Sequence, residues 1–270
     1  TGIALFAFNR PKHFEQTINQ LINFTDHPIY IYIDGADCKK TELLQDQILS
    51  TIDNIKRDRE SIFVLKSSTN QGLRKSITGG IKNTFLYCEK IIVIEDDIFI
   101  NSNFFKFMDY WLDNAEKNNE ILSVCGYQFP IAEDYYKDSK DIISLKLPRF
   151  MPWGWGTWKD KWNKYYDLNI TDVLQKYQNK YDMNSLPIDI KKFCTEKEYL
   201  ENIHDTWSIP WTLVHYFSRQ SCIFPSISLL ENIGFDGTGV HCTSTRVFNK
   251  SESNQLKPII EKKTISNKLK

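Results

Sequence analysis

Three consecutive carboxylates follow directly on a short apolar run. The run is Ile91–Ile94, and the acids are Glu95, Asp96 and Asp97. Such a run is typical of a strand buried on both faces, and three neighbouring like charges at its end repel one another unless a cation is held beside them. Mg²⁺ and Mn²⁺ prefer oxygen ligands and often bridge a carboxylate to phosphate oxygens. The pattern indicates a site for a metal and a nucleotide, and the alternative is an acidic turn in solvent.

Polar residues that could bind a nucleotide diphosphate follow the other apolar runs. Arg10 can pair with phosphate through its planar guanidinium or lie along a nucleobase, and its alternative is a surface residue at a helix start. Asp34 precedes a glycine, a pair that is also typical of a plain turn. Asn70, Gly72 and Arg74 precede an expected helix N-terminus, which favours phosphate, although this segment could also be a simple turn.

The first 125 residues alternate between apolar runs and segments with helical spacing. This alternation predicts an α/β fold with a mostly parallel sheet and helices on both of its faces. In such sheets ligands bind beyond the carboxyl ends of the strands, which is where the three acids lie. The expected strands are 3–8, 29–33, 62–65, 91–94 and 121–125, and the expected helices are about 11–23, 39–57, 75–88 and 103–118.

The alternation ends after residue 126. Trp153, Trp155 and Trp158 are separated by glycines, and such large flat side chains either line a ligand-binding surface or pack in a core. An amphipathic helix is expected at 204–218, with short strands near 223 and 229. The Lys-rich end of the chain is expected to be a loose tail.

Composition narrows the class of protein. The chain has 270 residues with 34 basic and 34 acidic side chains, a balance that argues against nucleic acid as a partner and against electrostatic membrane binding. The six cysteines form no C-x-x-C pair, which favours a reduced, cytoplasmic protein. No apolar run approaches the ~20 residues that span a bilayer. The chain starts inside an expected strand, as a trimmed catalytic fragment would, so peripheral association with the inner face of the membrane through parts outside it stays open.

Seven short motifs give the chain a resemblance to nucleotide-sugar glycosyltransferases of the GT-A fold. It resembles bacterial family-2-type enzymes and, more distantly, the Golgi N-acetylglucosaminyltransferase I family, over about residues 3–242. The resemblance implies one three-layer α/β/α domain at 1–245, with a nucleotide-sugar half at 1–125, an acceptor half at 126–245 and a basic tail at 246–270. The motifs are F-A-F-N-R-P at 6–11, I-Y-I-D-G at 31–35, N-Q-G-L-R at 70–74, E-D-D at 95–97, W-G-W-G-T-W at 153–158, H-D-T-W at 204–207 and N-I-G-F-D-G-T-G-V-H at 232–241.

The resemblance also implies roles for these residues. It places Mn²⁺ or Mg²⁺ on Asp97, with Asp96 near the ribose or the metal's waters and Glu95 near the hydroxyls of the donor sugar. The triplet is E-D-D rather than the commoner D-x-D, which leaves this division of roles open. His241 would bind the metal or phosphate, and a structural histidine is its alternative. The residues expected to bind the donor are Phe8, Asn9, Arg10, Asp34, Asn70, Gly72, Arg74, Glu95 and Asp96.

The implied reaction needs a charge stabiliser and a base. A divalent metal would stabilise the leaving nucleoside diphosphate, and a general base must accept the proton of the acceptor hydroxyl. Asp205 stands where these families carry an Asp base, and its alternative is a plain helix cap. One carboxylate acting on the acceptor implies direct displacement with inversion. Trp153, Trp155 and Trp158 would help to build the acceptor side, with a core brace as their alternative.

The expected function is transfer of a hexose or N-acetylhexosamine from a nucleotide diphosphate sugar, with a UDP-sugar as the expected donor, to a hydroxyl of a glycan or glycolipid. Two alternatives remain at this point. A nucleotidyltransferase shares the α/β plan but typically carries a Gly-rich basic loop after its first strand, where this chain has Phe8–Pro11. A non-catalytic carbohydrate-binding protein with a degenerate transferase fold would keep the tryptophans but would not need the acids.

Overall fold

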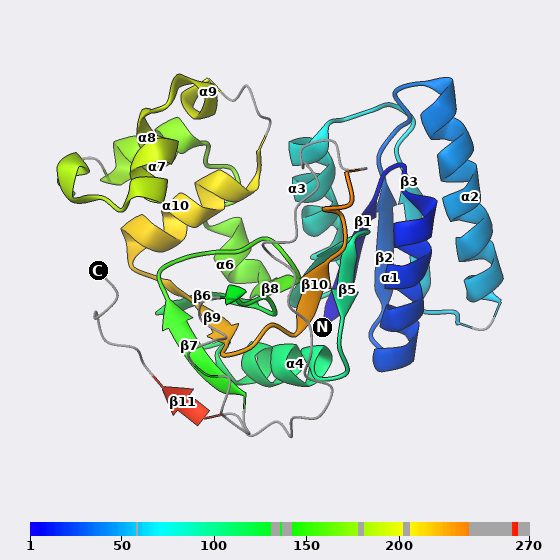
Figure 1. Ribbon diagram of the computed structural model, residues 1–270, viewed down its shortest axis with the longest axis horizontal. Coiled ribbons are helices and arrows are strands. Elements are labelled where there is room, and N and C mark those ends of the chain that lie inside the picture. Colours follow the sequence, from blue (N-terminus) through cyan, green and yellow to red (C-terminus); the bar gives the residue numbers. More distant parts are fainter. Residues whose placement is uncertain are drawn as a thin grey trace.

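Alternating strands and helices make up the first part of the protein, as its computed structural model shows (Figure 1). The structure describes residues 1–57, 59–130, 136, 142–177, 181–201 and 206–237, together with the backbone of 261–263. The elements of the first part are β1 (Gly2–Ala7), α1 (Pro11–Phe24), β2 (Ile29–Ile33), α2 (Lys39–Lys56), β3 (Ile62–Lys66), α3 (Leu73–Thr84), β4 (Lys90–Glu95), β5 (Ile98–Ile100), α4 (Phe104–Asn114) and β6 (Ile121–Cys125).

The second part is less regular and richer in short helices. Among the described residues its strands are β7 (Ile143–Leu147), β8 (Trp155–Trp158), β9 (Ser221–Pro225), β10 (Leu230–Asn232) and β11 (Glu261–Lys263). Its helices are α6 (Lys159–Asn163), α7 (Ile170–Tyr177), the 3₁₀ turn η2 (Met183–Ser185), α8 (Ile188–Thr195), α9 (Lys197–Leu200) and α10 (Ser208–Ser218).

One large sheet joins the two parts. Its strand order is β11-β7-β9-β6-β8-β4-β1-β2-β3, and the block β4-β1-β2-β3 is parallel throughout. β8 lies antiparallel between β4 and β6, so β4 and β6 point the same way. The prediction of an α/β fold with a mostly parallel central sheet is confirmed.

The direction of strand addition reverses beside β1. The chain leaves β1 toward β2 and β3 on one side and returns to β4 on the other side. In open α/β sheets such a switch point is where ligands bind, just outside the carboxyl ends of the two strands. The topology therefore directs attention to the residues that follow β1 and β4.

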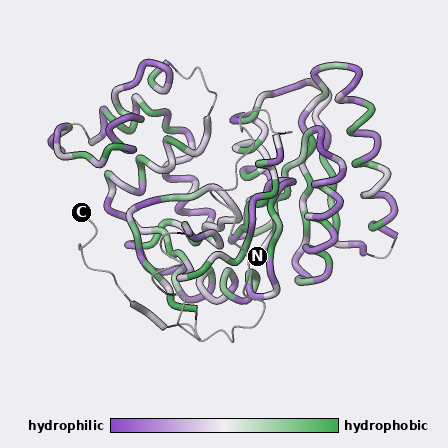
Figure 2. Tube along the Cα trace, in the orientation of Figure 1, coloured by the Kyte–Doolittle hydropathy of each residue, from purple (hydrophilic) through white to green (hydrophobic). Residues whose placement is uncertain are grey.

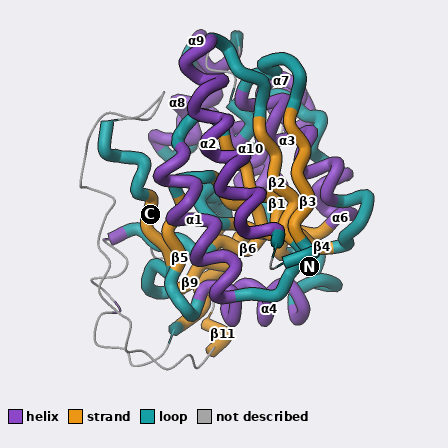
Figure 3. Tube along the Cα trace, turned by 90° about the vertical axis from the view of Figure 1, so that its right-hand side faces the viewer, coloured by secondary structure: helices purple, strands orange, loops and turns teal. Residues whose placement is uncertain are grey.

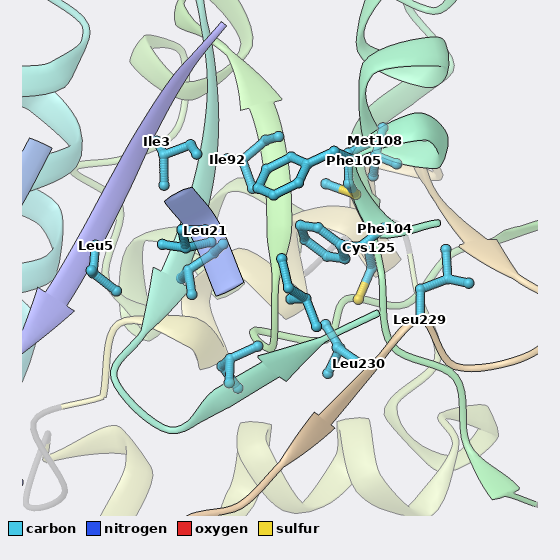
Figure 4. Packing of buried hydrophobic residues seen from close by; sticks show 14 of the residues in the cluster. Ile3, Leu5, Leu21, Ile92, Phe104, Phe105, Met108, Cys125, Leu229 and Leu230 are labelled. Carbon is cyan, nitrogen blue, oxygen red and sulfur yellow. The ribbon is translucent and has the colours of Figure 1, made fainter. Parts of the chain in front are cut away.

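Apolar side chains form a core on each face of the sheet. On one face, α1, α2 and α4 pack against side chains such as Ile3 and Ile92, and Figure 4 shows Phe105 of α4 beside Ile92 and Phe104 beside Cys125. On the other face, α3, α6, α7, α8 and α10 pack in a second cluster. Figure 3 shows α1 and α2 in front of the strands, and in Figure 2 the hydrophobic colour follows the central strands. The result is a three-layer α/β/α arrangement, as predicted.

The described helices also bear on membrane insertion. Within the part of the chain that the structure describes, none of the helices has the length and hydrophobicity that crossing a membrane requires.

Candidate active site

Arg10 and the acid triplet meet because their strands are neighbours. β1 and β4 pair in parallel with Phe6 opposite Glu95, so the segments that follow them leave the same edge of the sheet side by side. Pro11 opens α1 directly after Arg10. Proline is suited to the first position of a helix because its missing N–H has no partner there in any case. The helix start therefore fixes the backbone position of Arg10 next to the acids.

Arg10 bridges two carboxylates. Its Nη2 lies 2.5 Å from Asp96 Oδ1, and its Nη1 lies 2.9 Å from Asp97 Oδ2. Asp96 and Asp97 form the turn between β4 and β5, so the strict alternation of an extended strand does not continue through the triplet. Burial alone lowers the pKa of Arg10, but its ion pairs outweigh burial and raise the pKa overall. Arg10 is therefore a permanent cation held between these two acids.

Negative charge remains after this pairing, because one guanidinium faces three carboxylates. Burial raises the pKa of Asp96 to about 6 although Arg10 opposes the shift. Burial and the charges of Asp97 and Asp96 raise the pKa of Glu95 to about 8. Within the described part of the chain no hydrogen bond to the half-buried Glu95 carboxyl is found. Perturbed acids of this kind, beside a switch point, mark a candidate functional site.

A segment far along the chain completes the surroundings of the acids. β10 pairs with β5, and the N–H of Ile233 donates to the carbonyl of Asp97 at 2.9 Å. Gly234 then passes so close that an added Cβ would overlap the Asp97 carboxylate and lie 2.9 Å from Arg10 Nη1. Further on, Asp236 Oδ2 lies 3.2 Å from His13 Nε2 on α1. The described part of the motif at 232–241, residues 232–237, thus lies beside the acid triplet.

The sequence did not indicate that Gly234 and His13 belong to this site. Gly234 lies in a motif that drew attention for its Asp and His, and only the packing shows that its lack of a side chain matters. Thr17 was missed as well: its hydroxyl donates to the Asp96 carbonyl at 2.9 Å and helps to hold the turn.

Asp34 holds the loop that precedes α3. Its Oδ1 accepts from the backbone N–H groups of Gly35 and Gln71 at 2.8 and 2.9 Å, and its Oδ2 accepts from Gly72 at 3.1 Å. Asn70 donates to the Gly35 carbonyl at 2.9 Å, and Gly72 has a φ of 80°, which favours glycine. The structure thus brings together Asp34, Asn70 and Gly72 and gives Asp34 a tethering role that the sequence did not reveal, while their expected role in donor binding stays a prediction.

Two of the three candidate acceptor tryptophans belong to the core. Trp155 and Trp158 are 0% and 1% exposed, because β8 lies in the middle of the sheet and both of its faces are covered. The Trp158 indole donates to the carbonyl of Leu112 at 2.8 Å. Their expected place on an acceptor-facing surface is therefore corrected to a core position.

Trp153 differs from these two rings. It precedes β8, is half-buried, and meets Phe235 edge to face with ring centroids 5.5 Å apart. Since Phe235 follows Gly234, Trp153 is the tryptophan that borders the acid site. Its role toward an acceptor stays a prediction.

Two other predicted site residues, Asp205 and His241, lie outside the described residues. Thr206 and Trp207 are described, and Trp207 occupies the N-cap position of α10. The base at Asp205 and the ligand at His241 stay predictions.

The donor set of the triplet fits a hard divalent cation. Carboxylate oxygens are the ligands that Mg²⁺ and Mn²⁺ prefer, and the unbalanced negative charge favours a further cation. Among the described residues, however, no three metal-binding side chains already converge on one point. Because Arg10 holds both Asp96 and Asp97, these acids would have to share their oxygens between the guanidinium and the metal.

Comparison with known proteins gives structural similarity only. No protein-family profile and no curated protein matches the chain in sequence. A mannosyltransferase from Pyrobaculum calidifontis, solved with GDP-Man and Mn²⁺, is similar over 60% of this chain and 45% of its own, with a TM-score of 0.42 and 9% identity. S. aureus TarS, residues 1–349, is similar over 85% of this chain and 58% of its own, with a TM-score of 0.45 and 13% identity.

A third solved structure is a mannose-1-phosphate geranyltransferase from Thermus thermophilus. It is similar over 86% of this chain and 76% of its own, with a TM-score of 0.42 and 8% identity. The chain thus spans about half the length of the first two structures. Similarity of this extent does not place the chain in a family.

Proposed function

We propose that the protein is a glycosyltransferase that uses a nucleotide diphosphate sugar. The observation that carries this proposal is the joint position of Arg10, Glu95, Asp96 and Asp97 at the carboxyl ends of β1 and β4, where strand order reverses. This is the place where open α/β sheets bind nucleotides. A purely structural ion pair would need only one acid beside the arginine, whereas three carboxylates leave groups that can serve a metal and a donor sugar.

The donor would bind along the carboxyl edge shared by β1, β2 and β4. Arg10, which has five N–H donors, can retain one acid while its remaining N–H groups bind the diphosphate. The loop residues Asp34, Asn70 and Gly72, which are joined by hydrogen bonds beyond the end of β2, would contact the nucleoside. Phe8 and Asn9 leave β1 at the same edge, and Arg74 lies in the first turn of α3.

Asp97 is the described residue that would hold a divalent cation, with His241 as a further ligand, and Glu95 would face the hydroxyls of the donor sugar. When bound there, Mn²⁺ or Mg²⁺ would stabilise the negative charge of the leaving diphosphate. Asp96 is nearly fully buried and is held by Arg10 and by the N–H of Phe8 at 3.4 Å, so its task is to fix Arg10 and the turn. Gly234 leaves room for the Asp97 carboxylate, since an added side chain there would overlap it.

Asp205 would accept the proton of the acceptor hydroxyl. The hydroxyl oxygen then attacks the anomeric carbon as the bond to the nucleoside diphosphate breaks, so the configuration inverts. If Asp205 does not serve, Asp236 and Glu231 are the next candidates, because both lie on the segment that passes the acid site. Trp153 would contribute an aromatic wall on the acceptor side.

The test is turnover with a panel of UDP-, GDP- and ADP-sugars, measured with Mn²⁺ and again with excess chelator. We expect release of nucleoside diphosphate from one class of donor, and loss of this release in chelator. Release of pyrophosphate from a nucleoside triphosphate and a sugar phosphate would instead support a nucleotidyltransferase. Glycan binding without any nucleotide binding in calorimetry would support the carbohydrate-binding alternative.

A further inference from the structure

An open cavity lies at the edge of the sheet opposite the acid triplet. It surrounds the amino ends of β6 and β9, has a volume of about 500 Å³, and adjoins a second cavity of about 260 Å³. β6 runs in the same direction as β4, so its amino end and the carboxyl end of β4 belong to opposite edges. The residues that line both cavities are Asn119, Lys164, Tyr165 and Gln220.

Aromatic rings held in fixed positions form the wall of the larger cavity. Tyr177 stacks on Phe217 with centroids 6.0 Å apart, and Tyr181 meets Phe217 edge to face at 5.0 Å. The Tyr181 hydroxyl donates to the Phe217 carbonyl at 2.8 Å, and the Tyr165 hydroxyl donates to Gln220 Oε1 at 3.0 Å. A ligand would therefore meet a preorganised surface, which reduces the entropy lost on binding.

Positive charge predominates in the lining. Among the described residues that line the two cavities, Lys161, Lys164 and Arg219 are cations, whereas Asp160 alone is an acid. Lys164 and Arg219 lie over tyrosine rings at 5.1 and 5.9 Å and form no ion pair with a described carboxylate. Cations without an acidic partner, placed on aromatic rings, are suited to bind an anion.

Arg219 has a backbone conformation that normally favours glycine. It follows α10 with φ 56° and ψ 24°, and among the described residues it is the one non-glycine residue with positive φ. At this position after a helix, glycine avoids a steric cost that any other residue meets. Next to it, the buried Ser218 hydroxyl has no hydrogen-bond partner in the described structure. Both features place polar groups at the cavity at a cost in stability.

We propose that this cavity binds an anionic saccharide, that is, a sugar segment carrying carboxylate or phosphate, at a site separate from the donor site. Lys164 and Arg219 would neutralise the anion, and Asn119 would bind hydroxyl groups. The rings would contact the apolar face of a sugar. The volume lies within the range of about 300–1,000 Å³ that is typical of ligand sites. The choice of a saccharide rests on the proposed function, and the site would hold part of an acidic acceptor chain.

The experiment is a calorimetric titration of the full chain without nucleotide or metal. The probes are a tetrasaccharide of alternating glucuronic acid and N-acetylglucosamine, the neutral tetrasaccharide of N-acetylglucosamine, a tetrapeptide with two aspartates, and inorganic phosphate. We expect the acidic saccharide to bind at least about tenfold more tightly than the other three. Since no donor is present, failure here would leave the proposed transferase function untouched.

Variants then locate the binding. Arg219→Gly removes the cation at a position that suits glycine, so it should fold with an unchanged or higher melting temperature and lose about tenfold or more in affinity for the acidic saccharide. Lys164→Gln should weaken binding in the same way. Lys106→Gln, the same charge change at an exposed position of α4, is the matched control and should bind like the parent.

Three results would overturn the proposal. The first is equal affinity for the acidic and neutral saccharides. The second is equal affinity for the acidic peptide, which would show an anion site without preference for sugars. The third is parental affinity in both Arg219→Gly and Lys164→Gln, which would place binding elsewhere on the protein.

Discussion

Two polar sites border the same sheet, and they are built in opposite ways. At the carboxyl ends of β1 and β4, Glu95 forms no hydrogen bond within the described part of the chain and shares one arginine with two other acids. Away from that edge, where α10 packs on a face of the sheet, His215 is fully buried, and each ring nitrogen has a partner: Trp211 O at 2.8 Å and Ser123 Oγ at 2.7 Å. The acid site therefore carries excess negative charge, whereas the His215 site is neutral and has a hydrogen-bond partner for each ring nitrogen.

This difference separates the candidate binding site from a structural one. Burial lowers the pKa of His215 to about 4, so the ring stays neutral and acts as a bridge between α10 and β6. Burial and the charges of Asp97 and Asp96 raise the pKa of Glu95 to about 8, and the charge of Arg10 only partly opposes this shift. A half-buried acid with a raised pKa and no hydrogen bond from the described chain marks a candidate functional site. Four variants test this contrast, from the largest expected effect to the smallest.

The largest effect is expected for the proposed base. Asp205→Asn keeps the shape of the side chain but cannot accept a proton, so turnover should fall by about 10²–10⁴-fold while UDP binding stays near that of the parent. Turnover and a UDP titration with Mn²⁺ measure the two quantities. Asp97→Asn should differ by losing donor binding as well, because a metal ligand acts in the ground state too.

Asp182→Asn is the matched control for a plain helix cap. The Asp182 carboxylate accepts from the N–H of Asn184 at 2.9 Å, which is the role that Asp205 would have if it were only a cap. The control should keep full turnover. Full turnover in Asp205→Asn would move the base to Asp236 or Glu231.

Removing the shared cation tests the charge balance of the acid site. Arg10→Met leaves two largely buried acids without their counter-charge and should cost about 2–4 kcal/mol of unfolding free energy. Urea unfolding measures the cost. Mn²⁺ should raise the stability of this variant more than that of the parent, because a bound cation would replace the lost charge.

Arg149→Met is the control for an exposed ion pair. Arg149 lies 3.3 Å from Asp189 near the surface, so its loss should cost less than about 1 kcal/mol. If Arg10→Met were as stable as this control and indifferent to Mn²⁺, the acid site would not hold excess negative charge.

The pH dependence of stability tests the assignment of His215 as a neutral, buried bridge. The folded pKa of His215, about 4, lies below the usual value of 6.5, so the unfolded chain takes up a proton that the folded protein excludes. The contribution of His215 to the free energy of unfolding is therefore complete above pH 6.5. It is lost as the pH falls toward 4, by about 3 kcal/mol at most. In urea unfolding, His215→Gln should reduce this dependence. His27→Gln, a change at the less buried His27–Asp109 pair, should retain it; equal slopes in all three proteins would contradict the assignment.

The smallest effect concerns a close contact at the acid site. Gly234→Ala inserts a methyl group against Asp97 and Arg10 and should cost about 1–3 kcal/mol, together with weaker Mn²⁺-dependent UDP binding. Gly79→Ala is the control: it lies within α3 with no atom near its added Cβ and should gain about 0.5–1 kcal/mol. A Gly234→Ala variant with parental stability would show that the segment after β10 does not confine the acids.

The sequence predicted the regular elements of the first half well. The expected strand 29–33 and helix 39–57 match β2 and α2 almost residue for residue, because alternating and helical spacings are local properties of the chain. It did not predict β8, since a Trp-Gly-Thr-Trp segment resembles a surface motif until both of its neighbours in the sheet are known.

By itself, the sequence determined that three acids end a buried strand and that an arginine follows another. Whether these groups meet depended on the parallel pairing of β1 and β4, which joins Arg10 to Asp96 across 86 residues. The tether formed by Asp34, the approach of Gly234 and the burial of Trp155 and Trp158 were also decided only by the tertiary structure. The reason is physical: periodicity and turn chemistry act between near neighbours in the chain, whereas charge pairing and burial depend on which distant segments pack together.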